Sequence, residues 1–347
     1  MNRGSTPVTQ PWIRDIREGE SVRGRYHVAE KRVGTTRRGD LFISMTLSDR
    51  TGRMEAKVWD RAEAISPLFK QGDVVEVEGK AGAYRDQIQL TLSDLRKVED
   101  TPDPSLFLET APEEPARMVS ALKNVLGTVD NRHLKALTDR FVLDPRFMAS
   151  FCRAPAAKNF HHNYLGGLLE HTLSVCETAR QVAGQYARLD GDLLVTGAFL
   201  HDIGKIREYE VTSGIEYTDE GRLLGHLALG AAMLEERLAG MKDFPADLAL
   251  RLKHMILSHH GQFDFGSPKR PKFLEAFALH LIDDLDAKMN GLGRFLDQDP
   301  KEGAWTEYNR MFDRYLLKGR VRSGEPSEGP KTEDSGERQE RLFRADV

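Results

Sequence analysis

The sequence predicts a two-domain protein in which an all-β barrel is followed by an all-α domain. Three observations predict this class: period-two alternation within residues 13–98, an acidic proline-rich stretch after it, and helical periodicity from residue 115 onward. A chain of 347 residues suits about two domains better than one core. We expect a barrel at 13–98, a linker at 99–114, a helical domain at 115–318 and a disordered tail at 319–347.

Composition is that of a soluble globular protein, with 39% hydrophobic and 30% charged residues. No apolar run reaches the roughly 20 residues that span a bilayer, and the N-terminus lacks the apolar core of a signal peptide. We therefore expect no membrane partner. Because the only cysteines are Cys152 and Cys176, we also expect a cytoplasmic protein without a disulfide framework. The net charge of −4 neither favours nor excludes nucleic acid.

The strand pattern of the first domain is that of a five-stranded OB barrel. Ile43, Met45 and Leu47 alternate with Ser44 and Thr46, which marks a strand with one buried face. A second and a third strand flank a turn near residue 51, a short helix is expected at 61–73, and two strands follow. Three strands, a helix and two strands is the OB order, although the order alone also fits a small barrel that binds nothing.

Basic residues gather on the first strand and on the loop after it. Six of them lie between residues 23 and 38, against the single acidic residue Glu30: Arg23, Arg25, Lys31, Arg32, Arg37 and Arg38. OB folds bind oligonucleotides in this region, so we expect phosphate contacts from Arg23, Arg25, Arg37 and Arg38 rather than a merely solvated face.

Four aromatic residues sit on or beside these strands. Phe42 and Trp59 are the better candidates for base stacking, because each occupies the phase opposite the buried aliphatic residues of its strand. Tyr26 and Tyr84 are weaker candidates. For each ring, packing against the barrel remains the alternative.

The helical domain places histidines on the apolar stripes of four different segments: His171, His201, His226 and His259. One inward histidine is more often a hydrogen-bonded core residue than a ligand. Four of them, with Asp202 beside one and an aspartate-rich helix downstream, are hard to satisfy by mutual hydrogen bonds, whereas a divalent metal binds imidazole and carboxylate. Periodicity does not choose between Asp283 and Asp284, and it leaves His254 off the stripe.

At this point the motifs resemble a known family. "FLHDIGK" at 199–205 resembles the HD superfamily of metal-dependent phosphohydrolases, which are helical and bind one or two metals. Together with "PAAKNFHHNYLGGLLEHTLSV", "YTDEGRLLGH", "HMILSHHGQFDFGSPKRP", "DDLDAK" and the barrel, it is similar to the YhaM family, bacterial 3'-to-5' exoribonucleases that join an OB fold to an HD domain.

The resemblance implies the metal ligands. A first metal would take His171, His201, Asp202 and Asp283, where Asp283 is preferred because the last ligand of the superfamily matches the first aspartate of the motif. His226 and His259 would complete a second position, with His260 either a ligand or a phosphate contact. The resemblance makes manganese the first choice for the bound ions, with cobalt, iron and zinc as alternatives.

Further residues are assigned by position. Asp202, Lys205 and His260 are the expected catalytic residues, and Lys205 would neutralise a phosphate oxygen unless it merely caps a helix. Gly204 is expected because the chain must turn there. His161 and His162 would touch substrate or hold local structure.

The function implied is metal-dependent removal of nucleotides from the 3' end of single-stranded RNA, with single-stranded DNA and a homo-oligomer left open. Two rivals remain: an HD phosphohydrolase acting on a small nucleotide with a regulatory barrel, and a nucleic-acid-binding module whose HD site is inactive. The intact ligand set speaks against the second.

Overall fold

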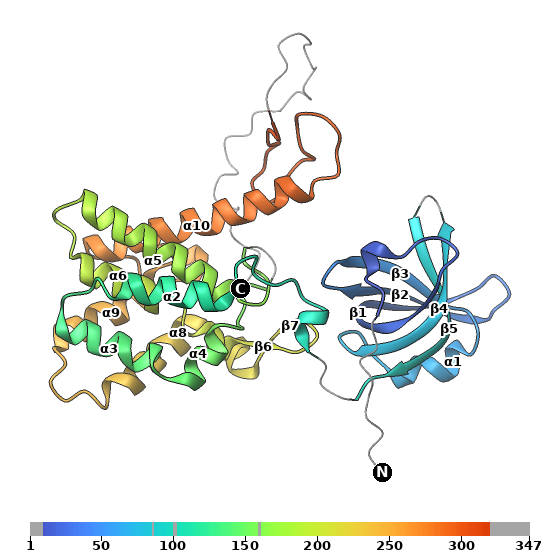
Figure 1. Ribbon diagram of the computed structural model, residues 1–347, viewed down its shortest axis with the longest axis horizontal. Helices are drawn as coiled ribbons and strands as arrows, with labels where there is room; N and C mark the ends of the chain where they lie inside the picture. The colour runs from blue at the N-terminus through green and yellow to red at the C-terminus, as the bar shows by residue number, and fades with distance from the viewer. Residues whose placement is uncertain (1–9, 85–86, 100–102, 159–160, 320–347) are drawn as a thin grey trace, which may run out of the picture. The chain divides into compact units, whose positions relative to one another are not determined.

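The computed structural model describes residues 10–84, 87–99, 103–158 and 161–319 (Figure 1). The chain divides into two compact units, one formed by Met1–Pro112 with Tyr209–Thr218 and the other by Glu113–Glu208 with Asp219–Val347. Most of the expected tail at 319–347 therefore lies outside the described residues. In the part of the chain that is described, every helix is too short or too polar to cross a membrane.

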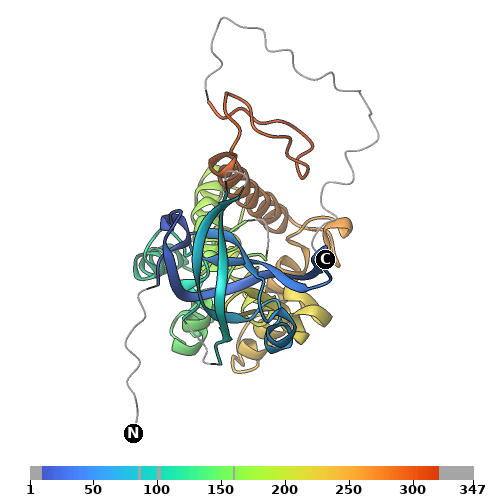
Figure 2. The same cartoon turned by 90° about the vertical axis from the view of Figure 1, so that its right-hand side faces the viewer.

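The first unit is the five-stranded OB barrel that the alternation predicts. Its strands close in the order β1-β2-β3-β5-β4, with antiparallel neighbours except for the parallel β3–β5 pair. The strands are β1 (Ser21–Thr35), β2 (Leu41–Asp49), β3 (Gly52–Val58), β4 (Val74–Tyr84) and β5 (Gln87–Lys97), and the short helix α1 (Ala62–Ile65) lies between β3 and β4. Figure 2 gives a second view of these strands.

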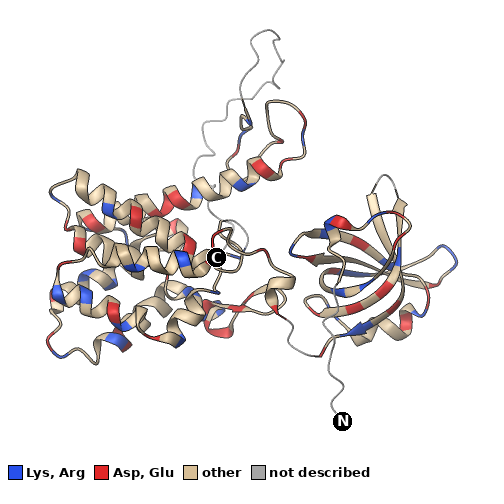
Figure 3. Ribbon diagram, viewed as in Figure 1, with Lys and Arg blue, Asp and Glu red and all other residues tan. Residues whose placement is uncertain are grey.

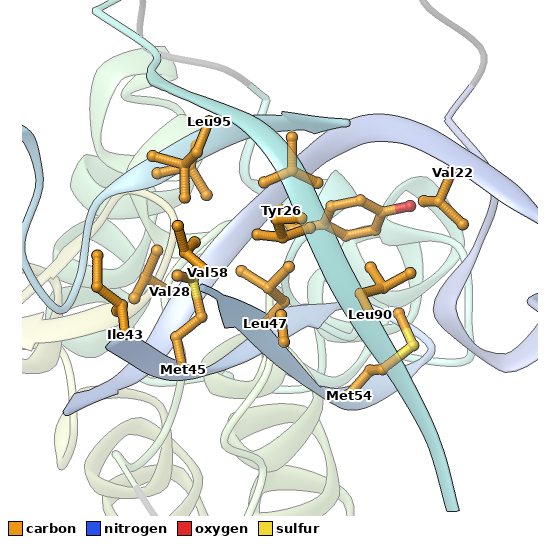
Figure 4. Close-up of a cluster of buried hydrophobic side chains, with 14 of the residues drawn as sticks. Val22, Tyr26, Val28, Ile43, Met45, Leu47, Met54, Val58, Leu90 and Leu95 are labelled. Atoms are coloured by element: carbon orange, nitrogen blue, oxygen red, sulfur yellow. The ribbon is translucent and has the colours of Figure 1, made fainter. Parts of the chain in front are cut away.

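The barrel core is filled from alternate positions of every strand (Figure 4). Ile43, Met45 and Leu47 point inward, as their period of two predicts. Tyr26 is also fully buried, and its hydroxyl donates a 2.7 Å hydrogen bond to the Pro11 carbonyl. The idea that Tyr26 stacks on a base is therefore wrong, because its ring is part of the core.

The second unit is helical, and a small hairpin connects two of its helices along the chain. The helices are α2 (Pro115–Leu126), α3 (Arg132–Val142), α4 (Pro145–Phe151), α5 (Gly167–Gln185), α6 (Gly191–Leu200), α7 (Lys205–Glu208), α8 (Asp219–Leu238), α9 (Ala246–Ser258) and α10 (Leu274–Gln298). The hairpin strands β6 (Tyr209–Val211) and β7 (Ile215–Tyr217) belong to the first unit. Helix α5 packs against α2, α6 and α10, so the apolar helix α6 is covered on several sides.

Two segments differ from the expectation. The helical pattern was expected to run to about residue 317, but α10 ends at Gln298, because Pro300 and Gly303 (φ 102°) follow. Within the expected linker, Pro104 and Phe107 are buried, and the Arg50 amide donates to the Leu106 carbonyl at 3.2 Å. This part of the segment therefore packs on the barrel instead of hanging between domains.

Candidate functional site

Five helices bring histidine and aspartate side chains to one buried place in the helical unit. His171 lies in the second turn of α5, while His201 and His259 cap the C-terminal ends of α6 and α9. His226 lies in α8 and Asp283 in α10. The apolar stripes of the four segments therefore bring their histidines together as expected. Each histidine lies on the apolar side of its own helix, and the helices pack through these sides.

A first set of donor atoms surrounds a common point. His171 Nε2 lies 3.1 Å from His201 Nε2, 3.2 Å from Asp283 Oδ1 and 3.5 Å from Asp202 Oδ2. His201 Nε2 lies 3.2 Å from Asp202 Oδ2 and 3.7 Å from Asp283 Oδ1. Ligands about 2.1 Å from one ion are separated by about 3.0 to 3.5 Å when their bonds meet at right or tetrahedral angles. Four of the five separations lie within this range and the fifth, 3.7 Å, lies just beyond it, so the set fits a metal site.

The hydrogen bonds of the two rings show why a cation belongs there. His171 Nδ1 donates to Asp286 Oδ2 at 2.7 Å, and His201 Nδ1 donates to the Ala198 carbonyl at 2.7 Å. With each Nδ1 proton used in this way, the two Nε2 atoms face each other at 3.1 Å, and in the metal-binding form of the rings both present lone pairs. Burial alone would lower the pKa of His171, but Asp202, Asp283 and Asp286 raise it well above its usual value, so a proton holds this place in the absence of a metal. A divalent ion would displace that proton and bind both lone pairs.

A second set of donors repeats this arrangement. His226 Nδ1 donates to Glu208 Oε1 at 3.1 Å and His260 Nδ1 to the Phe265 carbonyl at 2.8 Å, which leaves their Nε2 atoms 3.2 Å apart. His259 Nδ1 donates to the Ile256 carbonyl at 2.9 Å, and its Nε2 belongs to the same group of possible ligands. Burial lowers the pKa of His259 and of His260, so both rings stay neutral as metal ligands must.

Asp202 joins the two sets. Its Oδ2 faces the first set, whereas Oδ1 lies 3.4 Å from His259 Nε2 and 3.6 Å from His226 Nε2. No described group makes a hydrogen bond to Oδ1, although the atom is buried, so this lone-pair-bearing oxygen fits an ion. Burial alone would raise the pKa of Asp202, but Lys205 and the neighbouring histidines hold it well below its usual value.

Two glycines shape the backbone around the site, Gly204 by allowing close approach and Gly225 by its positive φ. A Cβ on Gly204 would lie 2.0 Å from the His226 carbonyl oxygen and 2.6 Å from the Gly230 nitrogen. The chain does turn at 201–204, but Gly204 does not have a positive φ, so backbone contact rather than the turn requires glycine. Gly225 has φ 72° inside α8, and the kink there directs His226 toward Glu208.

Matches to known protein families support the assignment of both units. Residues 14–98 match the model of an OB-fold nucleic acid binding domain, and residues 168–288 match the model of the HD domain. The protein named 3'-5' exoribonuclease YhaM from Bacillus subtilis (strain 168) is 36% identical over 296 residues, which is 85% of this chain and 92% of that protein. The chain belongs to the YhaM family. A second relative of the same name, from Shouchella clausii (strain KSM-K16), is 35% identical over 82% of this chain and 89% of its own.

Two carboxylates of this YhaM-family protein were missed by the sequence reasoning. Asp286 orients His171 and also accepts a hydrogen bond from Ser174, while Glu208 orients His226. Asp286 follows Asp283 by three residues and so shares its helix face, which is a signal that could have found it. Glu208 lies in a one-turn helix without useful periodicity, so no comparable signal pointed to it.

The structure distinguishes the residues that the sequence left as alternatives. Asp284 Oδ2 accepts from Lys288 at 2.7 Å outside the donor set, which leaves Asp283 as the candidate ligand. His254 accepts from the Lys272 amide at 3.1 Å, and the groups of possible ligands among the described residues do not contain it. His260, in contrast, belongs to the group formed with His226 and His259.

Lys205 and His161 lie beside the two donor sets, whereas His162 forms a separate group of possible ligands with His171 and Asp286. Lys205 is buried and donates from Nζ to Asp202 Oδ2 at 2.6 Å, so it is not a solvated helix cap. His162 is 3% exposed, lies 3.1 Å through Nε2 from Asp286 Oδ2 and hydrogen-bonds Tyr164 through Nδ1, which favours a positioning role over substrate contact. The His161 ring lies 5.6 Å from that of His171, and burial and nearby cations lower its pKa to about 3.

The barrel residues form two separate groups. Phe42 stacks on Trp59 with ring centroids 5.1 Å apart, and Gly34 on the paired strand leaves room for the Phe42 ring. Lys57 lies over Trp59 at 5.5 Å, which adds a cation to the aromatic pair.

The four arginines differ in how much charge they can offer. Arg37 and Arg38 are exposed on the loop between β1 and β2, where Figure 3 shows basic residues. Arg23 and Arg25 instead pair with Glu76, at 3.3 and 3.5 Å. Part of their charge is therefore already compensated.

Proposed function

We propose that this protein is a metal-dependent 3'-to-5' exoribonuclease that hydrolyses the phosphodiester bonds of single-stranded RNA. The observation that carries the proposal is the pair of histidine Nε2 atoms, His171 and His201, which face each other at 3.1 Å with both Nδ1 protons already used. Membership of the YhaM family, whose relatives are named 3'-5' exoribonucleases, supports the reaction and its direction.

The donors fit two divalent ions. His171, His201, Asp202 and Asp283 would hold the first ion, and His226, His259 and His260 would hold the second with Asp202 shared. Bound divalent ions supply Lewis acidity, which activates water and neutralises the charge of the phosphodiester. Mixed imidazole and carboxylate donors suit manganese, cobalt, iron or zinc better than magnesium, and manganese is the ion we test first.

The other residues of the site position the ligands and the substrate. Asp286 and Glu208 each hold one histidine in the tautomer that a metal requires. Lys205 balances the charge of Asp202, and its ammonium group supports a phosphate oxygen if that ion pair opens. On the barrel, Phe42 and Trp59 stack on bases while Arg37 and Arg38 contact phosphates.

The proposal is tested with 5'-labelled single-stranded RNA and manganese. We expect a ladder that shortens from the 3' end, no cleavage after chelation, and loss of cleavage in Asp202→Ala. Asp284→Ala, which changes an aspartate outside the donor set, should cleave like the wild type. Metal analysis of the purified protein then counts the ions per chain. Intact RNA after incubation of the wild type with each of the four metals would overturn the proposal.

The proposal also covers the cellular location, the choice between RNA and single-stranded DNA, and the oligomeric state. A cytoplasmic location is supported by Cys152 and Cys176, which are both unpaired. Single-stranded DNA is a second substrate to compare with RNA in the same assay. A homo-oligomer stays a prediction, which sedimentation of the purified protein measures.

A further inference from the structure

The loop that follows His259 and His260 is fixed to the candidate metal site at two points. Its first turn, the 3-10 helix Phe263–Phe265, offers the Phe265 carbonyl to His260 Nδ1 at 2.8 Å. The loop begins at Gly261, whose φ is 80° and whose Cα faces the His280 ring, and His280 Nδ1 donates to the His259 carbonyl at 2.8 Å. The position of this loop is therefore tied to two of the candidate ligands.

The same loop presents an aromatic ring and several cations. Phe263 is 58% exposed, and the guanidinium carbon of Arg270 lies 4.9 Å from the centre of its ring. Lys269 and Lys272 are exposed nearby in the chain, and Asp264 is the one acidic residue between 261 and 273. A single exposed aromatic residue is ordinary on a protein surface, and an arginine over a ring is common in proteins. The feature of interest is that this pair lies on a loop held by His260, a candidate metal ligand.

We propose that Phe263 and Arg270 form a stacking platform for a base of the RNA strand close to the bond that is cut. The proposal deepens the exoribonuclease function and rests on it. The chemistry is that of single-strand binding, in which an aromatic face accepts any base and neighbouring cations hold the backbone. Phe263 precedes Phe265, whose carbonyl accepts the hydrogen bond from His260, by two residues. The Cα atoms of Phe263 and Phe265 are therefore at most about 7 Å apart. This short path from Phe263 to His260 is the reason that we place the stacked base near the metal centre.

This platform differs from the aromatic pair on the barrel in what it does for the reaction. The barrel pair grips the strand wherever a base is available, whereas a base on Phe263 fixes the end of the strand relative to the ions. Loss of the ring should therefore affect a substrate that has bases and spare one that has none. Bis(p-nitrophenyl) phosphate, a small phosphodiester, is such a substrate.

The test compares the full-length protein with Phe263→Ala, Phe263→Tyr and the control Tyr186→Ala. Tyr186 is 62% exposed at the far end of α5 from His171, so it matches Phe263 in kind and exposure. For RNA cleavage with manganese, we expect kcat/KM of Phe263→Ala to fall about 10-fold, the range that stacking of one base on an aromatic ring gives. Phe263→Tyr and Tyr186→Ala should stay within about 2-fold of the wild type, and bis(p-nitrophenyl) phosphate hydrolysis and manganese affinity should not change in any variant.

Two results would overturn the platform. Equal RNA cleavage by Phe263→Ala and the wild type would show that no base uses the ring. A parallel loss on both substrates, with weaker manganese binding, would show that the loop only supports His260. Either result leaves the exoribonuclease function intact, because that function fails only when the wild type itself does not cleave RNA.

Discussion

Lys205 and Asp202 form a buried ion pair, with Lys205 Nζ 2.6 Å from Asp202 Oδ2. The pair spans one turn of chain directly after His201, and both side chains are almost fully buried. Burial alone would lower the pKa of Lys205, but Asp202 and the other carboxylates of the site raise it, so the ammonium form persists. A fixed positive charge thus lies within the same cluster that we expect to hold two ions.

Replacing Lys205 by methionine should destabilise the metal-free protein. The change leaves Asp202 buried without its cation, which costs about 3 kcal/mol of unfolding free energy, and added manganese should restore part of this loss. Urea denaturation with and without manganese measures both effects. Lys288→Met is the matched control, because Lys288 pairs with Asp284 at 2.7 Å but both side chains are about one-third exposed. Equal loss in the two variants would contradict the prediction.

Replacing Asp286 by asparagine should weaken binding of the first ion. The amide no longer fixes the Nδ1 proton of His171, and loss of such a partner typically costs about 10- to 100-fold in metal affinity. Calorimetric titration with manganese measures the affinity. Asp284→Asn removes a charge from the same helix away from the donors, so its affinity should match the wild type; an unchanged Asp286→Asn variant would refute the role.

Replacing Glu208 by glutamine should act on the second ion. Glu208 Oε1 accepts from the backbone amide and from Nδ1 of His226, at 3.0 and 3.1 Å, and neither contact involves the first donor set. At limiting manganese we expect the number of ions per chain to fall from about two toward one. The control is Glu236→Gln, a carboxylate paired with Arg207 at the surface. Loss of both ions together would argue against separate positioning of the two sites.

Replacing Trp59 by alanine should weaken RNA binding without unfolding the barrel. Trp59 is 45% exposed and stacks on Phe42, so its loss removes a base platform but little of the core. Fluorescence anisotropy with single-stranded RNA should show a Kd about 10-fold higher. Leu68→Ala serves as control, since Leu68 is an exposed apolar residue of the same barrel. Similar affinities for the two variants would place the RNA elsewhere.

The salt dependence of binding should separate the four arginines. Replacing both Arg37 and Arg38 by alanine should make the slope of log K against log salt shallower by about 1.4, or about 0.7 for each phosphate contact that is lost. Replacing Arg23 and Arg25 should change the slope less, because both are paired with Glu76. The same slopes for the two double variants would contradict this ranking.

Sequence periodicity predicted the barrel and the convergence of the histidines because both depend on which face of an element is apolar. Periodicity gave no information on contacts between distant segments. Asp286 meets His171 across 115 residues, and the choice between Asp283 and Asp284 depends on how α10 is rotated against α5. Tyr26 shows another limit, because a tyrosine on a strand can stack on a base or pack in the core, and only the structure shows its ring buried with the hydroxyl bonded to the Pro11 carbonyl.

The contact between Gly204 and the His226 carbonyl limits which residues position 204 can accept. One segment carries His201 and Asp202 and the other carries His226, and they meet main chain to main chain with no side chain between them. The distance between these two backbone segments is therefore set by peptide geometry and does not depend on a side-chain rotamer. Any residue larger than glycine at position 204 would push the two segments apart and so change the separation of the candidate ligands that they carry.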